Sequence, residues 1–113
     1  MADEERAAMM AMIFDVTQQA ADAFPEISLV PADKIPSFMQ GFSKGYSQKS
    51  APGIFVHTEK EKFSVNVSVA VKEGNPLTGT AVRFQAALAE ALLRAFPEKT
   101  DRVNVEVLKV MRV

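Results

Sequence analysis

Two glycines five residues apart bracket the stretch whose spacing comes closest to a chemical motif, Gly74-Asn-Pro-Leu-Thr-Gly79-Thr80. The pattern G-x-x-x-x-G between a strand and a helix is typical of loops that wrap nucleotide phosphates, but those loops need a lysine after the second glycine. Thr80 stands there instead, so we predict a strand-to-helix connection and no nucleotide site. Gly74 allows the turn and Thr78 or Thr80 caps the helix. The pattern leaves open whether the helix N-terminus at Thr80 binds an anion.

The other polar residues form no catalytic or metal-binding pattern. His57 is the only histidine, and no nearby Ser or Cys would act as its paired nucleophile. The chain has no cysteine, which excludes disulfides, Cys-ligated zinc and thiol catalysis. Glu59 and Glu61 alternate with lysines and are most simply a solvated turn. We therefore expect no catalytic residues, no cofactor and no metal, and we expect that the protein is not an enzyme.

Residues 34–49 combine basic and aromatic side chains, and no acidic residue occurs between Asp33 and Glu59. Such a segment suits a small ligand, a membrane surface or single-stranded nucleic acid, which gives an alternative function as a binding module. The simpler interpretation is that the rings pack under a sheet and the lysines are solvated. With three lysines and a net charge of −1, we do not expect nucleic acid as a partner. The residues are Lys34, Phe38, Phe42, Lys44, Tyr46 and Lys49.

The hydrophobic pattern predicts the elements that carry these residues. Spacings of three and four predict a helix over 3–24, a short helix over 35–46 and a helix over 78–96. Alternation predicts strands over 54–58, 63–71 and 102–113. The apolar positions shift after Val107, which indicates either a bulge or a strand end that is apolar on both sides. Residues 26–31 are expected to form an extended linker.

This order predicts one α+β domain over 1–113, in which residues 1–50 are the helical N-terminal part and residues 53–113 a β-β-α-β part. The sheet has three strands, with helices on one of its faces and an antiparallel hairpin formed by the first two strands. The pattern leaves open whether the last strand pairs with the first strand or with the second.

The outer face of the predicted sheet is the candidate interaction surface. If Ile54 and Val56 face the core, their neighbours face outward and gather apolar side chains on that face. Scattered surface apolar residues are the alternative, and an edge strand offers a second route to association. The surface consists of Phe55, His57, Ala70, Leu108 and Val110.

No apolar run approaches the roughly 20 residues that span a bilayer. The N-terminal residues Asp3, Glu4 and Glu5 are acidic, whereas a signal peptide begins with basic residues. We therefore expect a soluble, unprocessed, cytoplasmic protein that meets a membrane, if it does so, peripherally or through a partner.

The second half of the chain resembles the alkaline-shock, envelope stress response protein family of bacteria. The resemblance covers residues 53–112 and rests on alternating valine strands around a charged turn, a Gly and Pro connection, and a helix followed by a Val-Asn-Val strand. The chain departs from the family where a glycine-rich stretch often follows the first helix, since PEISLVPADKIPSF stands there. The segments that carry it are GIFVH, KFSVNVSVAVKEGNPL, AVRFQAALAEAL and DRVNVEVLKV.

The resemblance implies a small non-enzymatic protein that forms homo-oligomers near the cytoplasmic membrane. In that family, attachment to the membrane comes through a membrane-anchored protein partner. The leading functional hypothesis is therefore an interaction or scaffold protein.

Overall fold

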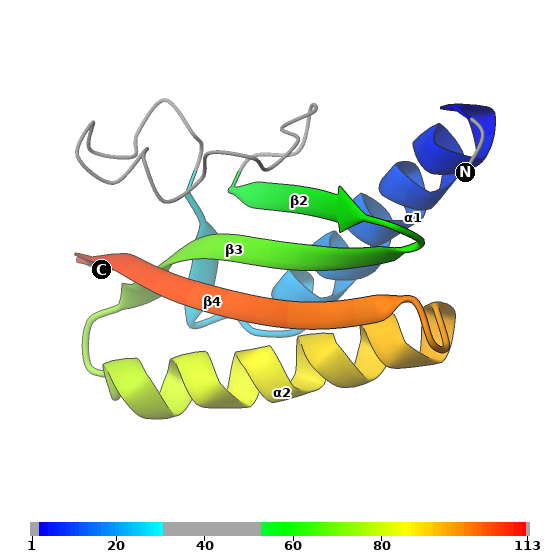
Figure 1. Ribbon diagram of the computed structural model, residues 1–113. Helices are drawn as coiled ribbons and strands as arrows, with labels where there is room; N and C mark the ends of the chain where they lie inside the picture. The colour runs from blue at the N-terminus through cyan, green and yellow to red at the C-terminus, as the bar shows by residue number, and fades with distance from the viewer. Residues whose placement is uncertain (1–2, 31–52, 113) are drawn as a thin grey trace.

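The computed structural model describes residues 3–30 and 53–112 (Figure 1). Its elements are α1 (Asp3–Asp22), β1 (Ile27–Leu29), β2 (Ile54–Glu59), β3 (Lys62–Lys72), α2 (Leu77–Ala95) and β4 (Thr100–Met111). The predicted α+β class, N-terminal helix and β-β-α-β order are confirmed. A short strand, β1, replaces part of the predicted linker, so the sheet formed by the described residues has four strands and not the three predicted. The helix predicted over 35–46 lies outside the described residues.

β3 is the central strand of a mixed sheet. β2 pairs with it antiparallel, with Ile54 opposite Val67, which confirms the predicted hairpin. β4 pairs with it in parallel along its length, from Phe63 opposite Thr100 to Lys72 opposite Met111. The last strand therefore pairs with the second strand of the hairpin, which resolves the question that the sequence left open.

β1 and β2 share the edge of β3 that β4 leaves available, and they lie end to end along it. β1 opposes residues 69–71 of β3, whereas β2 opposes residues 62–67. They meet at Ser68, whose carbonyl accepts a hydrogen bond from the Val30 N–H at 2.9 Å and whose N–H donates to the Gly53 carbonyl at 2.8 Å. β1 and β2 therefore form this edge of the sheet together, one after the other along β3, with a break between Val30 and Gly53.

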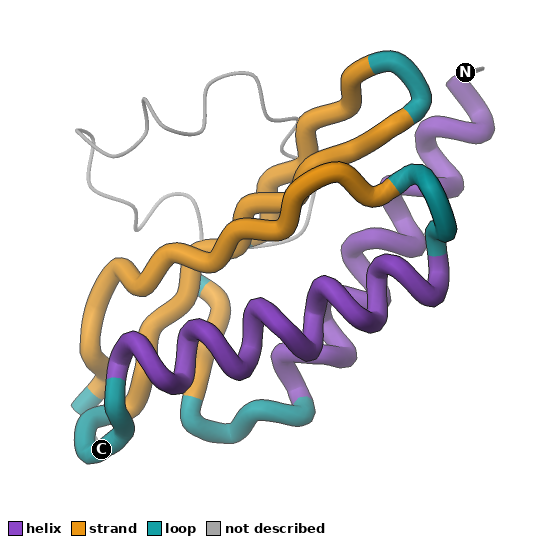
Figure 2. The backbone as a smooth tube through the Cα atoms, turned by 60° about the horizontal axis from the view of Figure 1, so that its bottom comes forward, coloured by secondary structure: helices purple, strands orange, loops and turns teal. Residues whose placement is uncertain are grey.

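Both helices pack on the same face of the sheet, as predicted (Figure 2). The odd-numbered residues of β3 point to that face and are fully buried, because helix side chains such as Ile13 of α1 and Leu88 of α2 cover them. Edge-to-face ring contacts link Phe24, just after α1, with Phe84 of α2 at 5.4 Å between centroids, and Phe63 of β3 with Phe96, just after α2, at 5.2 Å. The main core thus lies between β3 and the two helices.

α2 begins one residue earlier than predicted, and its capping differs from the prediction. Pro76 is the N-cap with φ −63°, and no side chain donates or accepts a capping hydrogen bond. Thr78 and Thr80 both lie inside the helix, so neither caps it, and Thr80 is buried. The proline ring fixes the φ of the residue that precedes the helix.

β4 contains a bulge, which is one of the two alternatives that the shift after Val107 left open. Val69 lies opposite Val107 and the next residue, Ala70, lies opposite Lys109, so Leu108 is the extra residue. A second irregularity separates Thr100 from Arg102. Between these two shifts, residues 102–107 oppose residues 64–69 of β3 one for one.

Candidate functional site

The sheet face opposite the helices, here called the second face, brings together most of the predicted interaction surface. Phe55 lies opposite Asn66 and His57 opposite Ser64, so both side chains share the face of the even-numbered β3 residues. Phe55 and Ala70 form a small apolar cluster with Val30, and Leu108 packs against it. Four of the five predicted residues therefore lie on one face, as expected.

The cluster is closed rather than exposed, which corrects the expected role of Phe55. Its side chain is only 3% exposed and that of Ala70 only 1%, since Val30 and Leu108 pack around them. The sequence pattern missed this packing because it did not predict β1, which brings Val30 to the cluster. Phe55 and Ala70 are therefore interior residues and offer little surface to a partner.

Val110 does not belong with the other four residues. The bulge at Leu108 shifts the alternation, so Val110 lies opposite Val71, a residue of the main core. Its side chain is 46% exposed, at the end of β4. The predicted basic and aromatic residues Lys34, Phe38, Phe42, Lys44, Tyr46 and Lys49 lie outside the described residues.

The glycine-bracketed stretch forms the predicted strand-to-helix connection. Gly74 has φ +92°, the left-handed conformation that a glycine tolerates. The side chain of Asn75 donates to the Lys72 carbonyl at 3.1 Å and closes the turn. Thr80 is buried, and its Oγ1 atom accepts a hydrogen bond from Arg83 Nη2 of the same helix at 3.5 Å.

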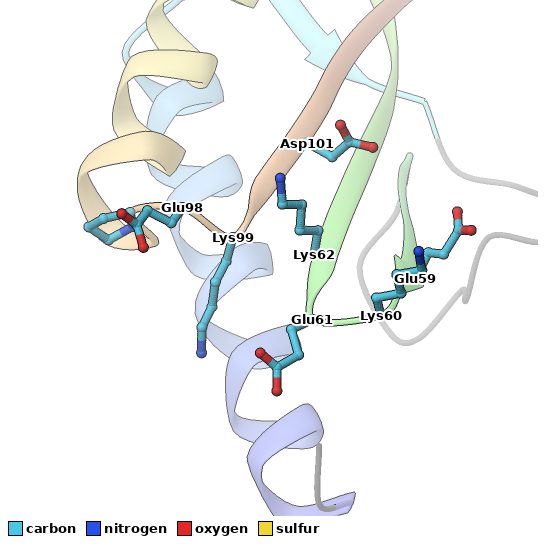
Figure 3. Close-up of a pocket in the computed structure, with 8 residues that line it drawn as sticks. Glu59, Lys60, Glu61, Lys62, Glu98, Lys99 and Asp101 are labelled. Atoms are coloured by element: carbon cyan, nitrogen blue, oxygen red, sulfur yellow. The ribbon is translucent and has the colours of Figure 1, made fainter.

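A hollow of about 610 Å³ lies between the β2–β3 turn and the α2–β4 turn (Figure 3). Its lining carries charges of both signs, and the labelled side chains point in different directions instead of converging on one point. Across residues 3–30 and 53–112, no three His, Asp or Glu side chains are grouped so that they could hold a metal ion. The hollow is therefore a solvated charged surface. Its lining residues are Glu59, Lys60, Glu61, Lys62, Pro97, Glu98, Lys99 and Asp101.

Asn66 is the unusual polar residue of the second face. It is 3% exposed, and its Oδ1 atom has no hydrogen-bond partner in the described part of the chain. A buried acceptor without a partner costs about 1–3 kcal/mol. Its cross-strand neighbours are Phe55 on β2 and Asn104 on β4.

The outer edge of β4 is the clearest unpartnered surface. β4 pairs with β3 on one side, and no strand of the described residues pairs with its other side (Figure 1). Natural edges are usually protected by charged side chains, Pro, bulges or short length. β4 has twelve residues, and its regular stretch 102–107 carries the charged residues Arg102 and Glu106 and has a register shift at each end, but the stretch itself contains no Lys, Pro or bulge. The stretch therefore presents a row of backbone N–H and C=O groups to an incoming strand.

Side chains of this stretch alternate between the two faces of the sheet. Val103, Val105 and Val107 pack at the border of the main core. Arg102, Asn104 and Glu106 lie opposite even-numbered residues of β3, on the second face. Asn104 and Arg102 are exposed, and Glu106 is half-buried.

Comparisons of the chain with protein-family models, with curated proteins and with solved structures found no match. Neither described helix is long and apolar enough to cross a membrane.

Proposed function

We propose that this protein is a non-enzymatic interaction or scaffold protein that self-associates. The observation that supports the proposal is the outer edge of β4, which is long, regular over residues 102–107 and without a partner strand in the described chain. The expected surface around Phe55 gives little support, because that cluster is closed. Association through a sheet edge draws on backbone hydrogen bonds and needs no large apolar patch.

The setting of this scaffold is proposed from the resemblance to the envelope stress response proteins. The protein acts in the cytoplasm near the membrane and reaches it through a membrane-anchored protein partner. Fractionation of cells that naturally produce the chain tests this part. The chain should sediment with membranes and leave them, still bound to an integral protein, in mild detergent. Recovery in the soluble fraction alone contradicts it.

Self-association is tested by sedimentation equilibrium from low to high micromolar protein. The average mass should rise above that of the monomer, and Asn104→Lys should keep the chain monomeric, because a lysine in the middle of an edge disfavours strand addition. Gln85→Lys adds the same charge on an exposed position of α2 and should leave association unchanged. A wild-type chain that stays monomeric throughout overturns the proposal.

A further inference from the structure

We infer that the partner of the β4 edge is a second copy of this chain, paired antiparallel about a twofold axis at Asn104. The inference rests on the proposed self-association and adds its geometry. A twofold axis perpendicular to the sheet makes the contact isologous, so each strand meets its own copy. Arg102 of one copy then lies opposite Glu106 of the other, Val103 opposite Val105, and Asn104 opposite Asn104.

Charge complementarity selects this register. Arg102 and Glu106 stand at equal distances on either side of Asn104, and both lie on the second face. The dimer therefore contains two Arg–Glu pairs directly across the new strand pair, an arrangement that stabilises antiparallel sheets. An axis at Arg102 or at Glu106 would instead place two like charges opposite each other. An axis at Val103 or Val105 would separate Arg102 from Glu106.

The irregularities of β4 limit the contact to the same stretch. Register shifts lie between Thr100 and Arg102 and between Val107 and Lys109, so the strand is regular only over 102–107. Bulges increase the local twist and turn a strand away from a straight partner. The pairing from Arg102 to Glu106 fits inside this window and leaves both bulges outside it.

The two faces of the new strand pair also match. On the helix-bearing side, the half-exposed side chains of Val103 and Val105 meet their counterparts from the second copy. On the second face, Asn66 and Asn104 of each copy form one row across four strands. Asn104 has an amide that can donate to the unpartnered Oδ1 of Asn66 while accepting from the Asn104 of the second copy. The axis thus falls beside the one buried acceptor of this face that lacks a partner in the described chain.

A cysteine at the axis tests the register directly, because the natural chain contains none. In Asn104→Cys, the two introduced cysteines lie opposite each other, and directly opposite residues of antiparallel strands have Cα atoms about 4.5–5.5 Å apart, which a disulfide spans. Mild oxidation at micromolar protein should yield a covalent dimer. Lys109→Cys is the matched control, since two residues 109 would lie roughly 34 Å apart and should stay reduced.

Charge reversal supplies a second test that does not depend on oxidation. Arg102→Glu alone and Glu106→Arg alone should each raise the dimer dissociation constant about tenfold, because each homodimer then holds two like-charge pairs. An equimolar mixture of the two variants should recover the wild-type dissociation constant as a heterodimer with opposite charges paired. Thermal melts of the separate variants establish that both fold.

The two levels of the proposal fail in different ways. A monomeric wild type at high micromolar concentration removes the proposed function and this inference together. A wild type that dimerises while Asn104→Cys gives no covalent dimer, or while the mixed variants show no recovery, keeps self-association and overturns this register.

Discussion

Gly53 and Gly74 both have a left-handed backbone, but their surroundings differ. Gly53 has φ +74° and sits where β1, β2 and β3 meet, and a Cβ atom there would lie 2.7 Å from the Val30 carbonyl oxygen and 2.9 Å from that of Ser68. Gly74 has φ +92° and open space around it. A side chain at position 53 would therefore overlap backbone atoms, whereas a side chain at position 74 would only strain the backbone.

Gly53→Ala should cost about 3 kcal/mol or more of unfolding free energy, because left-handed strain of about 1–2 kcal/mol is added to an overlap with two backbone oxygens. Gly74→Ala, with the strain alone, should lose only about 1–2 kcal/mol. Urea unfolding of both variants measures the difference. Equal losses would mean that the junction of β1 and β2 is not as close as described.

Thr17 is a buried residue of α1 whose hydroxyl oxygen has no hydrogen-bond partner in the described chain. Thr17→Val keeps the shape and removes the hydroxyl, so the protein should gain about 1 kcal/mol of stability. Thr17→Ser keeps the hydroxyl and removes the methyl group, so it should lose stability. Chemical denaturation of the pair separates the two effects. A valine variant less stable than wild type would show that the hydroxyl does have a partner.

α2 has one buried face and one exposed face. Phe84, Leu88 and Leu92 are fully buried in the main core, whereas Leu93 is 52% exposed. Leu88→Ala should therefore cost about 2–5 kcal/mol, since it leaves a cavity between the helix and the sheet. Leu93→Ala makes the same chemical change on the same helix and should stay within about 0.5 kcal/mol. Thermal unfolding of both checks this, and similar losses would contradict the orientation of α2.

At the scale of elements, strong periodicity was sufficient to predict structure, and short or irregular segments were not. The alternation of Phe63 to Val71 predicted β3, and the three- and four-residue spacings predicted both helices to within two residues at each end. β1 has three residues, too few for a periodic signal, and it is a strand only because β3 supplies its hydrogen-bond partners.

The candidate site was only partly predictable, for a related reason. The pattern assigned Phe55, His57, Ala70 and Leu108 to one face correctly, because side chains alternate along a strand. The pattern could not show that Phe55 is buried, since its burial depends on packing against Val30. It also could not place Val110, since the bulge changes which face each residue after it occupies. The free edge of β4 required the strand order, which only the fold provides.

Across the whole molecule, the two edges of the sheet differ in a way that favours one of them for association. One edge is divided between β1 and β2, so it is broken between Val30 and Gly53. The other edge is the continuous strand β4, with no partner strand in the described chain. Both helices cover one face, so a second copy joined at β4 extends the sheet with the helices of both copies on the same side.

Amide hydrogen exchange along β4, measured by NMR at low and at high protein concentration, tests self-association through this edge most directly. Alternate N–H groups of a strand point to opposite sides, so half of those in residues 102–107 bond to β3 and half point outward. We predict that the outward amides become more protected as the concentration rises, while the amides that bond to β3 stay protected throughout. Exchange of the outward amides that does not change with concentration, in a sample whose average mass does rise, would place the contact elsewhere and contradict the account.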